Sequence, residues 1–588
     1  MNTPVREGET IEGSRTMRNR PYPVLKCSRD DDDTVHGRRP NVDGTRFIIV
    51  FTHNRARIIR HPVSPKSSPP HSGGRRPSGM ALVFAVPRAL LLLFCGAAQA
   101  YTEPGDRDWP SLSLWSSFAG QLSGSPADLT KVSGSMYRMC RAAGTDAKNI
   151  RKAAAGICMQ QHQCANTKCA WEGNAWGSPN DVPSGLPAYT VAVRNTADVQ
   201  AAVRFAREHN IKVSVKNTGH NSIGSSTTAG SLLIWMYHFK PSTHSATGQR
   251  WPTGVAPWKD SCGVIHPDVL RVGAASTWED AYLAAAAHNP PMDMVGGGGL
   301  TVGAAGGWLQ GGGLSAMARA QGLGVDNVRS FEVVLADGSH ITADACENED
   351  MFWALRGGGG GTFGVVTAVR YQTHPSVRTI AFGLEIYLDK IEARWGTAKK
   401  EEAVRDFVDF WVRKAPTIDR RWGGYWHLKG FLSLHFRDFS GTKPFSVIDA
   451  KATLIDDVER WLAGKEWGTR TYVFRGNSGE YDGYFEARGR NKYFDASGAV
   501  RIEVHSRLIP TDWLTSRPDD AVNTLLRIAQ LPGVHSSGSY LLGGAVSDVG
   551  ERDTAMNPAV RRATFAINLG SLNPYVPSDV ADLNSAIQ

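Results

Sequence analysis

The feature that most restricts the fold of this chain is a glycine-rich stretch, residues 295–313, in which ten of nineteen residues are glycine. Glycine has no Cβ atom, so its backbone adopts tight or left-handed conformations and comes close to a bound ligand. A stretch with fewer glycines would hold a flat ligand further from the main chain. We therefore expect residues 295–313 to form part of a binding site for a flat molecule.

A second stretch has the composition of a binding loop and contains one histidine. An alternating apolar strand, residues 211–215, leads into small residues that include Gly219 and Gly224, with His220 between them. Successive backbone N–H groups in such a loop form a concavity that binds anions, which suits a pyrophosphate. Loops of Gly, Ser and Asn are also common as plain turns, and in that case His220 is incidental.

Four pieces of the sequence together resemble a known family. They are residues 216–220, residues 301–303 with the glycines around them, residues 322–328 and residues 360–367. Their order and spacing are similar to those of the FAD-binding domain of the vanillyl-alcohol oxidase/p-cresol methylhydroxylase (PCMH) superfamily, and of the fungal berberine-bridge-enzyme-like oxidoreductases in particular. The resemblance covers residues 183–376. It implies an α+β fold with a two-subdomain PCMH-type FAD-binding domain, followed by a substrate domain in which helices back an antiparallel sheet.

The resemblance also implies roles for individual residues. His220 matches the histidine that bonds covalently to the 8α carbon of the flavin; the alternative is a histidine that touches FAD without a bond. Many relatives have a second, cysteinyl bond, but the matching position here is Gly299, which has no thiol. A small side chain at the position of Val302 leaves O2 a path to the flavin. The residues expected to bind FAD are Lys216, Asn217, Thr218, Gly219, His220, Asn221, Gly224, Ser225, Gly298, Gly299, Thr301, Val302, Gly303, Gly306, Gly307, Gly311, Gly361, Gly364, Val365 and Val366.

Periodicity indicates helices and strands in the same part of the chain. We expect strands over residues 187–193 and 211–215, helices over 278–288 and 350–355, and a hairpin of 331–336 and 340–342 around Asp337-Gly338. A further helix is expected to be capped by Thr196 and to run to Asn210. This mixture of elements predicts an α+β domain.

Other nucleotide and hydrolase motifs are excluded by context or absence. Residues 359–364 fit the dinucleotide pattern G-x-G-x-x-G, but they follow a predicted helix and lead into a strand, whereas that pattern requires strand, glycines and then helix. The sequence has neither G-x-x-x-x-G-K-S/T nor G-x-S-x-G. Nucleotide hydrolysis and serine-hydrolase chemistry therefore lose their main support.

The N-terminal residues differ from the rest in charge and composition. Residues 1–79 contain 15 Lys/Arg and 8 Asp/Glu, so they and Arg88 supply most of the net charge of +9, and the chain from Tyr101 onward carries about +1. A body this close to neutral gives no argument for nucleic acid. We expect residues 1–79 to be a disordered leader, or an artefact of the gene model with Met80 as the true start.

Residues 80–100 have the layout of a secretory signal peptide. An apolar stretch of ten residues follows Arg88 and ends in the small-x-small sequence Ala98-Gln99-Ala100. The alternative is a signal anchor, but the uninterrupted apolar stretch is too short to span a bilayer comfortably. We expect secretion, with no membrane contact after cleavage.

Six cysteines follow the predicted cleavage site, and four of them fall in residues 101–182. These four, Cys140, Cys158, Cys164 and Cys169, suggest one or two disulfides in an N-terminal segment of a secreted protein. A zinc site formed by His162, Cys164 and Cys169 is the rival interpretation, but these residues lack the further Cys-x2-Cys pair that a zinc site would need. We expect no metal.

Residues 377–545 are expected to form the substrate domain. Predicted helices over 401–414 and 450–464 alternate with strands, and Trp and Tyr are frequent, as in residues 422–426. Aromatic walls suit a flat or sugar-like substrate, although aromatic residues are more often core. Glu503 is a candidate catalytic base, but it alternates with Arg501, His505 and Arg507, which is also the pattern of a solvated charged face.

Residues 546–588 are expected to be a truncated return segment. Relatives continue past the region of residues 554–558 into a strand and a helix that return to the flavin domain, and in many members that piece supplies the tyrosine that takes the substrate proton. The printed sequence ends at Gln588 without them. Two explanations stay open: the base comes from the substrate domain or is absent, or the gene model is wrong at this end.

These observations predict a secreted FAD-dependent oxidoreductase. The resemblance implies that a hydride passes from a C–H next to O or N of a small molecule to the flavin, with O2 as the expected acceptor. Two alternatives stay open at the level of sequence. One is a flavin-containing cyclase without net redox chemistry, and the other is a degenerate flavin-binding protein.

Overall fold

The structure is a computed structural model. It divides into two units, residues 1–96 and residues 97–588. The described residues are 46–52, 55–61, 101–124, 128–132, 186–221, 225–239, 254–428, 432–438, 451–468, 473–474, 479–484, 486, 503–530, 534–536 and 539–571. The predicted signal peptide, the four cysteines between 140 and 169, Gly224 and residues 572–588 lie outside them. None of the helices in the described ranges is long and apolar enough to cross a membrane.

The first unit contains one antiparallel hairpin within the predicted leader. Strand β1 (Arg46–Thr52) pairs with β2 (Arg55–His61), and Ile48 lies opposite Ile59. The centre of β1 is the apolar sequence of residues 47–51.

The second unit begins with a four-stranded sheet. It consists of β3 (Leu129–Lys131), β4 (Tyr189–Ala192), β6 (Leu232–Trp235) and β5 (Val213–Lys216), in that order. β4 and β5 both pair in parallel with β6, which is buried at every position. A parallel strand buried on both faces reads as a continuous apolar run, as the Leu-Leu-Ile-Trp of β6 does. Helix α5 (Thr196–Glu208) packs Val199 and Ala202 into the same core.

The N-cap of α5 differs from the prediction by one residue. Asn195, not Thr196, has the extended backbone of a cap, and its side chain accepts a hydrogen bond from the backbone N–H of Asp198 at 3.0 Å. Thr196 is the first helical residue. The helix ends at Glu208, close to the predicted Asn210.

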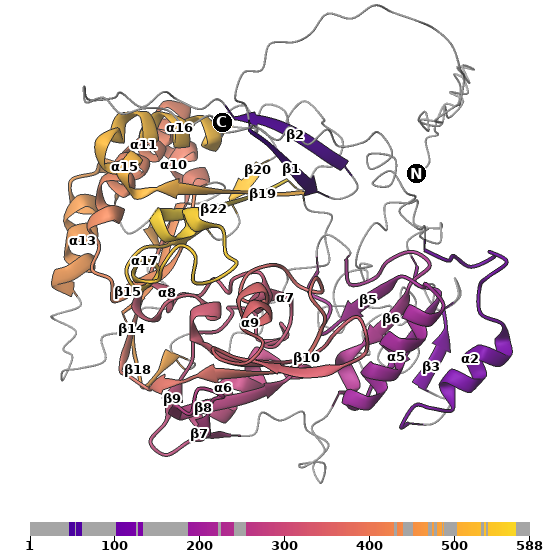
Figure 1. Cartoon of the computed structure of the whole chain (residues 1–588). Helices are drawn as coiled ribbons and strands as arrows, with labels where there is room; N and C mark the ends of the chain where they lie inside the picture. The colour runs from indigo at the N-terminus through magenta and orange to yellow at the C-terminus, as the bar shows by residue number, and fades with distance from the viewer. Residues whose placement is uncertain are drawn as a thin grey trace, which may run out of the picture. The chain divides into compact units, whose positions relative to one another are not determined.

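A five-stranded antiparallel sheet follows in the chain. Its strands, in spatial order, are β11 (His340–Ala343), β10 (Val328–Val334), β12 (Val365–Gln372), β8 (Ile265–Gly273) and β7 (Val255–Lys259). The predicted hairpin at Asp337-Gly338 is β10 and β11. Helices α6 (Trp278–Ala286) and α9 (Glu349–Leu355) pack on the face that carries Val272, Phe331 and Val369 (Figure 1).

The third sheet has nine strands and a helical layer on one face. Its strands are β14 (Thr379–Ile386), β15 (Trp422–His427), β16 (Leu432–Asp438), β17 (Val473–Phe474), β18 (Gly479–Tyr481), β19 (Glu503–Pro510), β20 (Val534–Ser536), β21 (Ser539–Leu541) and β22 (Ala563–Ser571). The main path is β17-β14-β16-β15-β21-β22-β19, and every pair is antiparallel. β22 belongs to this sheet although it lies within residues 546–588.

Five helices cover one face of the nine-stranded sheet. They are α10 (Leu388–Trp395), α11 (Thr397–Lys414), α13 (Asp456–Ala463), α15 (Thr511–Ser516) and α16 (Pro518–Gln530) (Figure 1). Leu384, Trp426 and Phe565 of the sheet pack against Phe407 and Trp411 of α11. The predicted fold class, α+β with an antiparallel substrate sheet backed by helices, is confirmed.

A buried arginine fixes the nine-stranded sheet to the glycine-rich region. Arg319, in helix α8 (Ala318–Gln321), donates from Nε to the carbonyl oxygen of Trp422 at 2.9 Å and from Nη2 to that of Ile418 at 2.6 Å. Its Nη1 donates to the carbonyl oxygen of Leu542. Burial lowers the pKa of this guanidinium to about 10, so it stays charged at neutral pH. One side chain thus joins three segments in or beside the nine-stranded sheet to the glycine-rich region.

A second buried tie joins residues 322–328 to residues 554–561. Asp326, in residues 322–328, forms a bidentate ion pair with Arg561 at 2.7 and 2.8 Å, and both side chains are almost fully buried. Arg561 also donates to the hydroxyl oxygen of Thr554 at 3.1 Å. Met556 fills the space beside Gly312 and Gly357, where a Cβ would lie 2.5 and 2.6 Å from its sulfur. Residues 322–328 and residues 554–561 therefore pack against each other.

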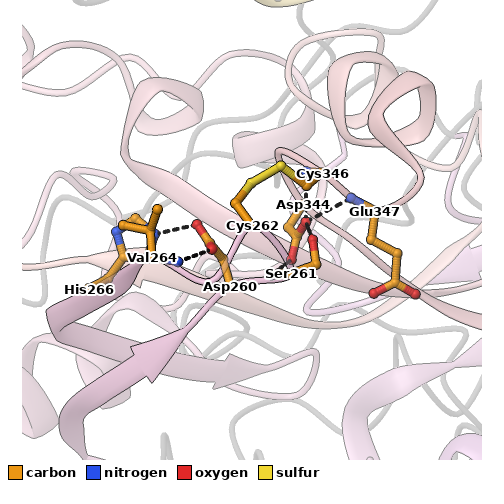
Figure 2. Close-up of a disulfide and its surroundings, with 8 residues drawn as sticks. All are labelled: Asp260, Ser261, Cys262, Val264, His266, Asp344, Cys346 and Glu347. Carbon is orange, nitrogen blue, oxygen red and sulfur yellow. Dashed lines mark hydrogen bonds and ion pairs between the residues drawn. A yellow bond between two sulfur atoms is a disulfide. The ribbon is translucent and has the colours of Figure 1, made fainter.

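The structure contains a disulfide that the sequence did not indicate. Cys262, in the turn between β7 and β8, is bonded to Cys346, which follows β11, with 5.3 Å between the two Cα atoms (Figure 2). β7 and β11 are the opposite edges of the five-stranded sheet. Beside the disulfide, Asp344 accepts hydrogen bonds from the backbone N–H groups of Ser261, Cys346 and Glu347. The bridge and this carboxylate hold the two edges together.

Candidate functional site

Strand β5 delivers the histidine loop. It ends at Lys216, which is fully buried, and the chain continues through Asn217 to Asn221. Gly219 has φ +94°, in the left-handed region that favours glycine, so any other residue there would be strained. The next residue, His220, is half-buried.

Two side-chain hydrogen bonds join this loop to the glycine-rich stretch. The hydroxyl oxygen of Thr218 accepts from the backbone N–H of Gly303 at 2.9 Å. His220 Nε2 and the hydroxyl oxygen of Thr301 are 2.9 Å apart and share a hydrogen bond. The loops run antiparallel here, because moving two residues along one moves the contact two residues back along the other.

The glycine-rich stretch is itself fixed on the start of helix α6. The backbone N–H of Trp278 donates to the carbonyl oxygen of Val302, and that of Glu279 to the carbonyl oxygen of Leu300, both at 2.9 Å. The first N–H groups of a helix have no partner within the helix, so these carbonyls satisfy them. Thr301 lies between the two anchored residues.

Some glycines of the stretch are required by contacts within the protein. A Cβ at Gly296 would lie 2.4 Å from the Tyr282 hydroxyl oxygen and 2.6 Å from the Trp278 ring, and one at Gly297 would lie 2.7 Å from the Trp278 ring. A Cβ at Gly303 would lie 2.8 Å from the side chain of Asn217, and one at Gly306 would lie 3.1 Å from it. These positions let aromatic rings and the histidine loop pack against the main chain.

Other glycines face open space. A Cβ at Gly298, Gly307 or Gly361 would meet no heavy atom within 4 Å. The loop of Gly361 adjoins the glycine-rich stretch, because the backbone N–H of Gly359 donates to the carbonyl oxygen of Gln310 at 3.0 Å. A Cβ at Gly360 would lie 2.9 Å from the Cα of Gly307. The histidine loop, the glycine-rich stretch and residues 357–361 are therefore connected neighbours.

This arrangement fits an extended, phosphorylated cofactor such as FAD. Open glycine positions let a ligand lie against the main chain, and the histidine is held beside them. Among the described residues no group of three or more His, Cys, Asp and Glu side chains forms a metal site. The polar chemistry of the arrangement is that of backbone N–H groups, hydroxyls and one imidazole.

Several predicted FAD ligands have packing roles as well. A Cβ at Gly364 would lie 2.7 Å from Val333, and the side chains of Val365 and Val366 are buried in core clusters. Any contact of these three with a cofactor would be through the main chain. Asn221 donates to the hydroxyl of Ser225 at 2.7 Å and so closes the histidine loop. Gly311 lies at the end of helix α7 (Gly307–Gln310), and a Cβ there would lie 3.1 Å from the carbonyl oxygen of Gly307.

The candidate base Glu503 is the first residue of β19, opposite Ser571. Its position has the same parity along the strand as Ile509, which packs in the core between the sheet and its helices. The opposite parity includes Leu508, which packs against the core of the flavin side. The strand register thus favours the row of Leu508, and not that of Glu503, as the neighbour of a bound flavin.

The register identifies a row of residues that sequence reasoning missed. Tyr425 lies opposite Tyr540, Tyr540 opposite Ala566, and Ala566 opposite Leu508. The last three belong to or pack against the cluster that also contains Leu300 of the glycine-rich stretch. The rings of Tyr425 and Tyr540 meet edge to face, 5.8 Å apart.

A second pair of tyrosines connects this region to the glycine-rich stretch. The ring of Tyr484 lies edge to face on Tyr282, with centroids 5.7 Å apart. The Tyr282 hydroxyl donates to the carbonyl oxygen of Gly297 at 2.9 Å.

Burial raises the pKa of Tyr540 far above its usual value, so its hydroxyl stays protonated and able to donate.

Comparison with known families finds the FAD binding domain, matched over residues 187–251. This match contains β4, α5, β5 and the histidine loop. Over parts of its length the chain is similar to proteins named VAO-type flavoprotein oxidase and FAD-linked oxidoreductase. The VAO-type flavoprotein oxidase VAO615 of Thermothelomyces thermophilus is 32% identical over 388 residues, 64% of this chain and 60% of that protein. The FAD-linked oxidoreductase ZEB1 of Gibberella zeae is 40% identical over 225 residues, 38% of this chain and 37% of that protein. The aligned part thus spans less than two thirds of these relatives.

Solved flavoprotein structures have the same fold. The VAO-type flavoprotein MtVAO713 from Myceliophthora thermophila has a TM-score of 0.63 at 24% identity, covering 83% of this chain and 86% of that one. The berberine bridge enzyme from Eschscholzia californica has a TM-score of 0.52 at 17% identity, covering 81% and 82%. The similarity extends over both the flavin side and the nine-stranded sheet.

A methyl group added to an open glycine should affect FAD binding, whereas one added to a packed glycine should affect stability. Gly307→Ala meets no heavy atom, so the unfolding temperature should hardly change, but binding of FAD should weaken about tenfold, equivalent to about 1.4 kcal/mol. Gly303→Ala must displace Asn217 and should destabilise the protein without FAD by about 1–3 kcal/mol. Both are measured in a His220→Ala background, where FAD stays exchangeable, by FAD titration and denaturant unfolding. If Gly307→Ala binds FAD as its parent does, the open glycines do not form the cofactor site.

Proposed function

We propose that this chain is an FAD-dependent oxidase of a small molecule, with FAD bonded to His220 and O2 as the final electron acceptor. The observation that carries the proposal is the docking of His220 on Thr301 beside glycines that face open space. The relatives that are named FAD-linked oxidoreductases support the reaction class.

The residues that would hold FAD are those of the three adjoining loops. Gly298, Gly307 and Gly361 leave room against the main chain, and Thr218 with Asn217 keeps the histidine loop in contact with them. Bound FAD supplies a two-electron acceptor, and the protein supplies position and electrostatics.

His220 is suited to a single covalent attachment. A neutral imidazole has one nitrogen with a lone pair, which makes it a competent nucleophile. Because Nε2 contacts Thr301, we assign the bond to Nδ1. Gly299 offers no thiol for a second bond.

The substrate would lie between the flavin loops and the face of the nine-stranded sheet that carries Tyr425 and Tyr540. Tyr425 and Tyr540 are partly buried on this face, and the protonated Tyr540 hydroxyl can donate to an oxygen or nitrogen of the substrate. Asn568 follows two residues after Ala566 on the same face and lies opposite Ser506. Such a wall of rings and hydrogen-bonding groups suits a small alcohol or amine whose C–H next to the heteroatom is the hydride donor.

Oxygen access is assigned to Val302. Its side chain is half-buried against the core, and its carbonyl is fixed by helix α6. A larger side chain at this fixed position would narrow the approach to the neighbouring flavin.

Secretion is proposed from the signal-like residues 80–100 and is supported by the disulfide between Cys262 and Cys346, since disulfides persist in oxidising compartments.

Covalent attachment predicts that acid-precipitated protein stays yellow. A flavin bonded to the chain cannot wash out, and a proteolytic peptide containing His220 should carry the mass of FAD. His220→Ala should give a colourless pellet, whereas the control His288→Ala, on a histidine after helix α6, should not. A colourless wild-type pellet with free FAD in the supernatant would contradict the attachment.

Val302→Leu should slow the reaction with O2 while leaving substrate oxidation unchanged. Leucine has one methylene more than valine, and this extra reach at a fixed site should raise the barrier by about 1.4 kcal/mol or more, at least about tenfold in rate. Stopped-flow mixing of the reduced enzyme with air measures this step, and a dye acceptor that reacts at the flavin edge is the control. Equal reoxidation of Val302→Leu and wild type would remove Val302 from the O2 path.

A further inference from the structure

We infer that Thr301 is a positioning residue for flavin attachment: its hydroxyl holds Nε2 of His220 and directs the covalent bond to Nδ1. The inference rests on the proposed covalent attachment of FAD. It assigns to this hydroxyl a task beyond contact with the cofactor.

The first observation is that Thr301 cannot drift away from His220. Its two neighbours, Leu300 and Val302, both have their carbonyl oxygens bonded to the first N–H groups of helix α6 at 2.9 Å. The hydroxyl oxygen of Thr301 and Nε2 of His220 are 2.9 Å apart. An anchored hydroxyl at hydrogen-bond distance restricts the position of Nε2.

The second observation is that the loops have an independent fastening. The contact of Thr218 with the N–H of Gly303, also 2.9 Å, keeps the histidine loop on the glycine-rich stretch. Asn217 adds packing against Gly303 and Gly306. The bond between His220 and Thr301 is therefore not the sole tie between the loops, and a chemical role can be separated from a structural one.

The chemistry explains why the bond at Nε2 matters. In a neutral imidazole one nitrogen carries the proton and the other the lone pair, and the partner of one nitrogen sets the state of the other. When Nε2–H donates to the Thr301 oxygen, the lone pair is on Nδ1, which is then the nucleophile. This hydrogen bond also strengthens as positive charge develops on the ring during bond formation.

The step balances with O2 as the oxidant. His220 Nδ1 forms a bond to the 8α carbon, which gives up one C–H hydrogen as a proton, and the ring returns to neutrality by releasing the Nε2 proton. Two electrons from the broken C–H bond pass through the isoalloxazine to O2. With the two protons they give H2O2.

Four proteins test the inference: wild type, Thr301→Val, Thr301→Ser and Thr218→Val. Thr301→Val keeps the shape and removes the hydroxyl, Thr301→Ser keeps the hydroxyl, and Thr218→Val removes the other side-chain bond between the same loops. Each is produced under riboflavin limitation and then incubated with saturating FAD. Covalent flavin is followed by intact mass after denaturation, and the linkage isomer by the pH-dependent fluorescence of the purified flavin peptide.

We expect Thr301→Val to form the bond about tenfold more slowly, because a hydrogen bond to a developing charge is lost, and to yield some product at Nε2. Thr301→Ser should stay within about twofold of wild type. Thr218→Val loosens the docking of the two loops and so lowers the rate of attachment, but it should give product at Nδ1 alone. The inference is overturned if Thr301→Val matches wild type in both rate and isomer, or if Thr301→Ser is as slow as Thr301→Val. It is also overturned if Thr218→Val gives the same mixture of Nδ1 and Nε2 products as Thr301→Val, since the effect would then be loop docking. No covalent flavin in wild type would instead refute the proposed attachment itself.

Discussion

The site depends on one interaction, the antiparallel docking of the histidine loop on the glycine-rich stretch. Thr218 meets Gly303 and His220 meets Thr301, each at 2.9 Å. The carbonyls of Leu300 and Val302 satisfy the start of helix α6, so the stretch is part of the helix's own hydrogen bonding. A loop of glycines would otherwise have a large conformational entropy to lose on folding. The docking converts it into a fixed surface.

The glycines serve two physical purposes within one sequence run. Gly296 and Gly297 admit the rings of Trp278 and Tyr282, whereas Gly298 and Gly307 face open space. The first pair makes a tight core beneath the surface, and the second leaves that surface accessible to a flat ligand. The hydrogen bonds from Arg319 to Trp422 and Ile418 then hold the nine-stranded sheet on the same core.

Local signals in the sequence predicted the elements that carry the site. The strand predicted over residues 211–215 is found as β5 (Val213–Lys216), and the hairpin at Asp337-Gly338 and the helix predicted over residues 278–288 are also found. The sequence could not predict contacts that depend on distant pairing. Cys262 and Cys346 are 84 residues apart, and the facing of Tyr425 and Tyr540 follows from strand register, which no local pattern specifies. By the same register, these tyrosines and not Glu503 lie on the face of the sheet that we assign to the substrate.

Hydrogen–deuterium exchange of the His220→Ala protein, with and without FAD, tests the central claim most directly. The account predicts that FAD slows exchange in three segments, residues 216–221, 296–313 and 357–364, because the cofactor lies against their main chain. Helices α11 and α16, on the far face of the nine-stranded sheet, should be unaffected. Protection that is absent from the three segments, or that is centred on the helical layer, would contradict it.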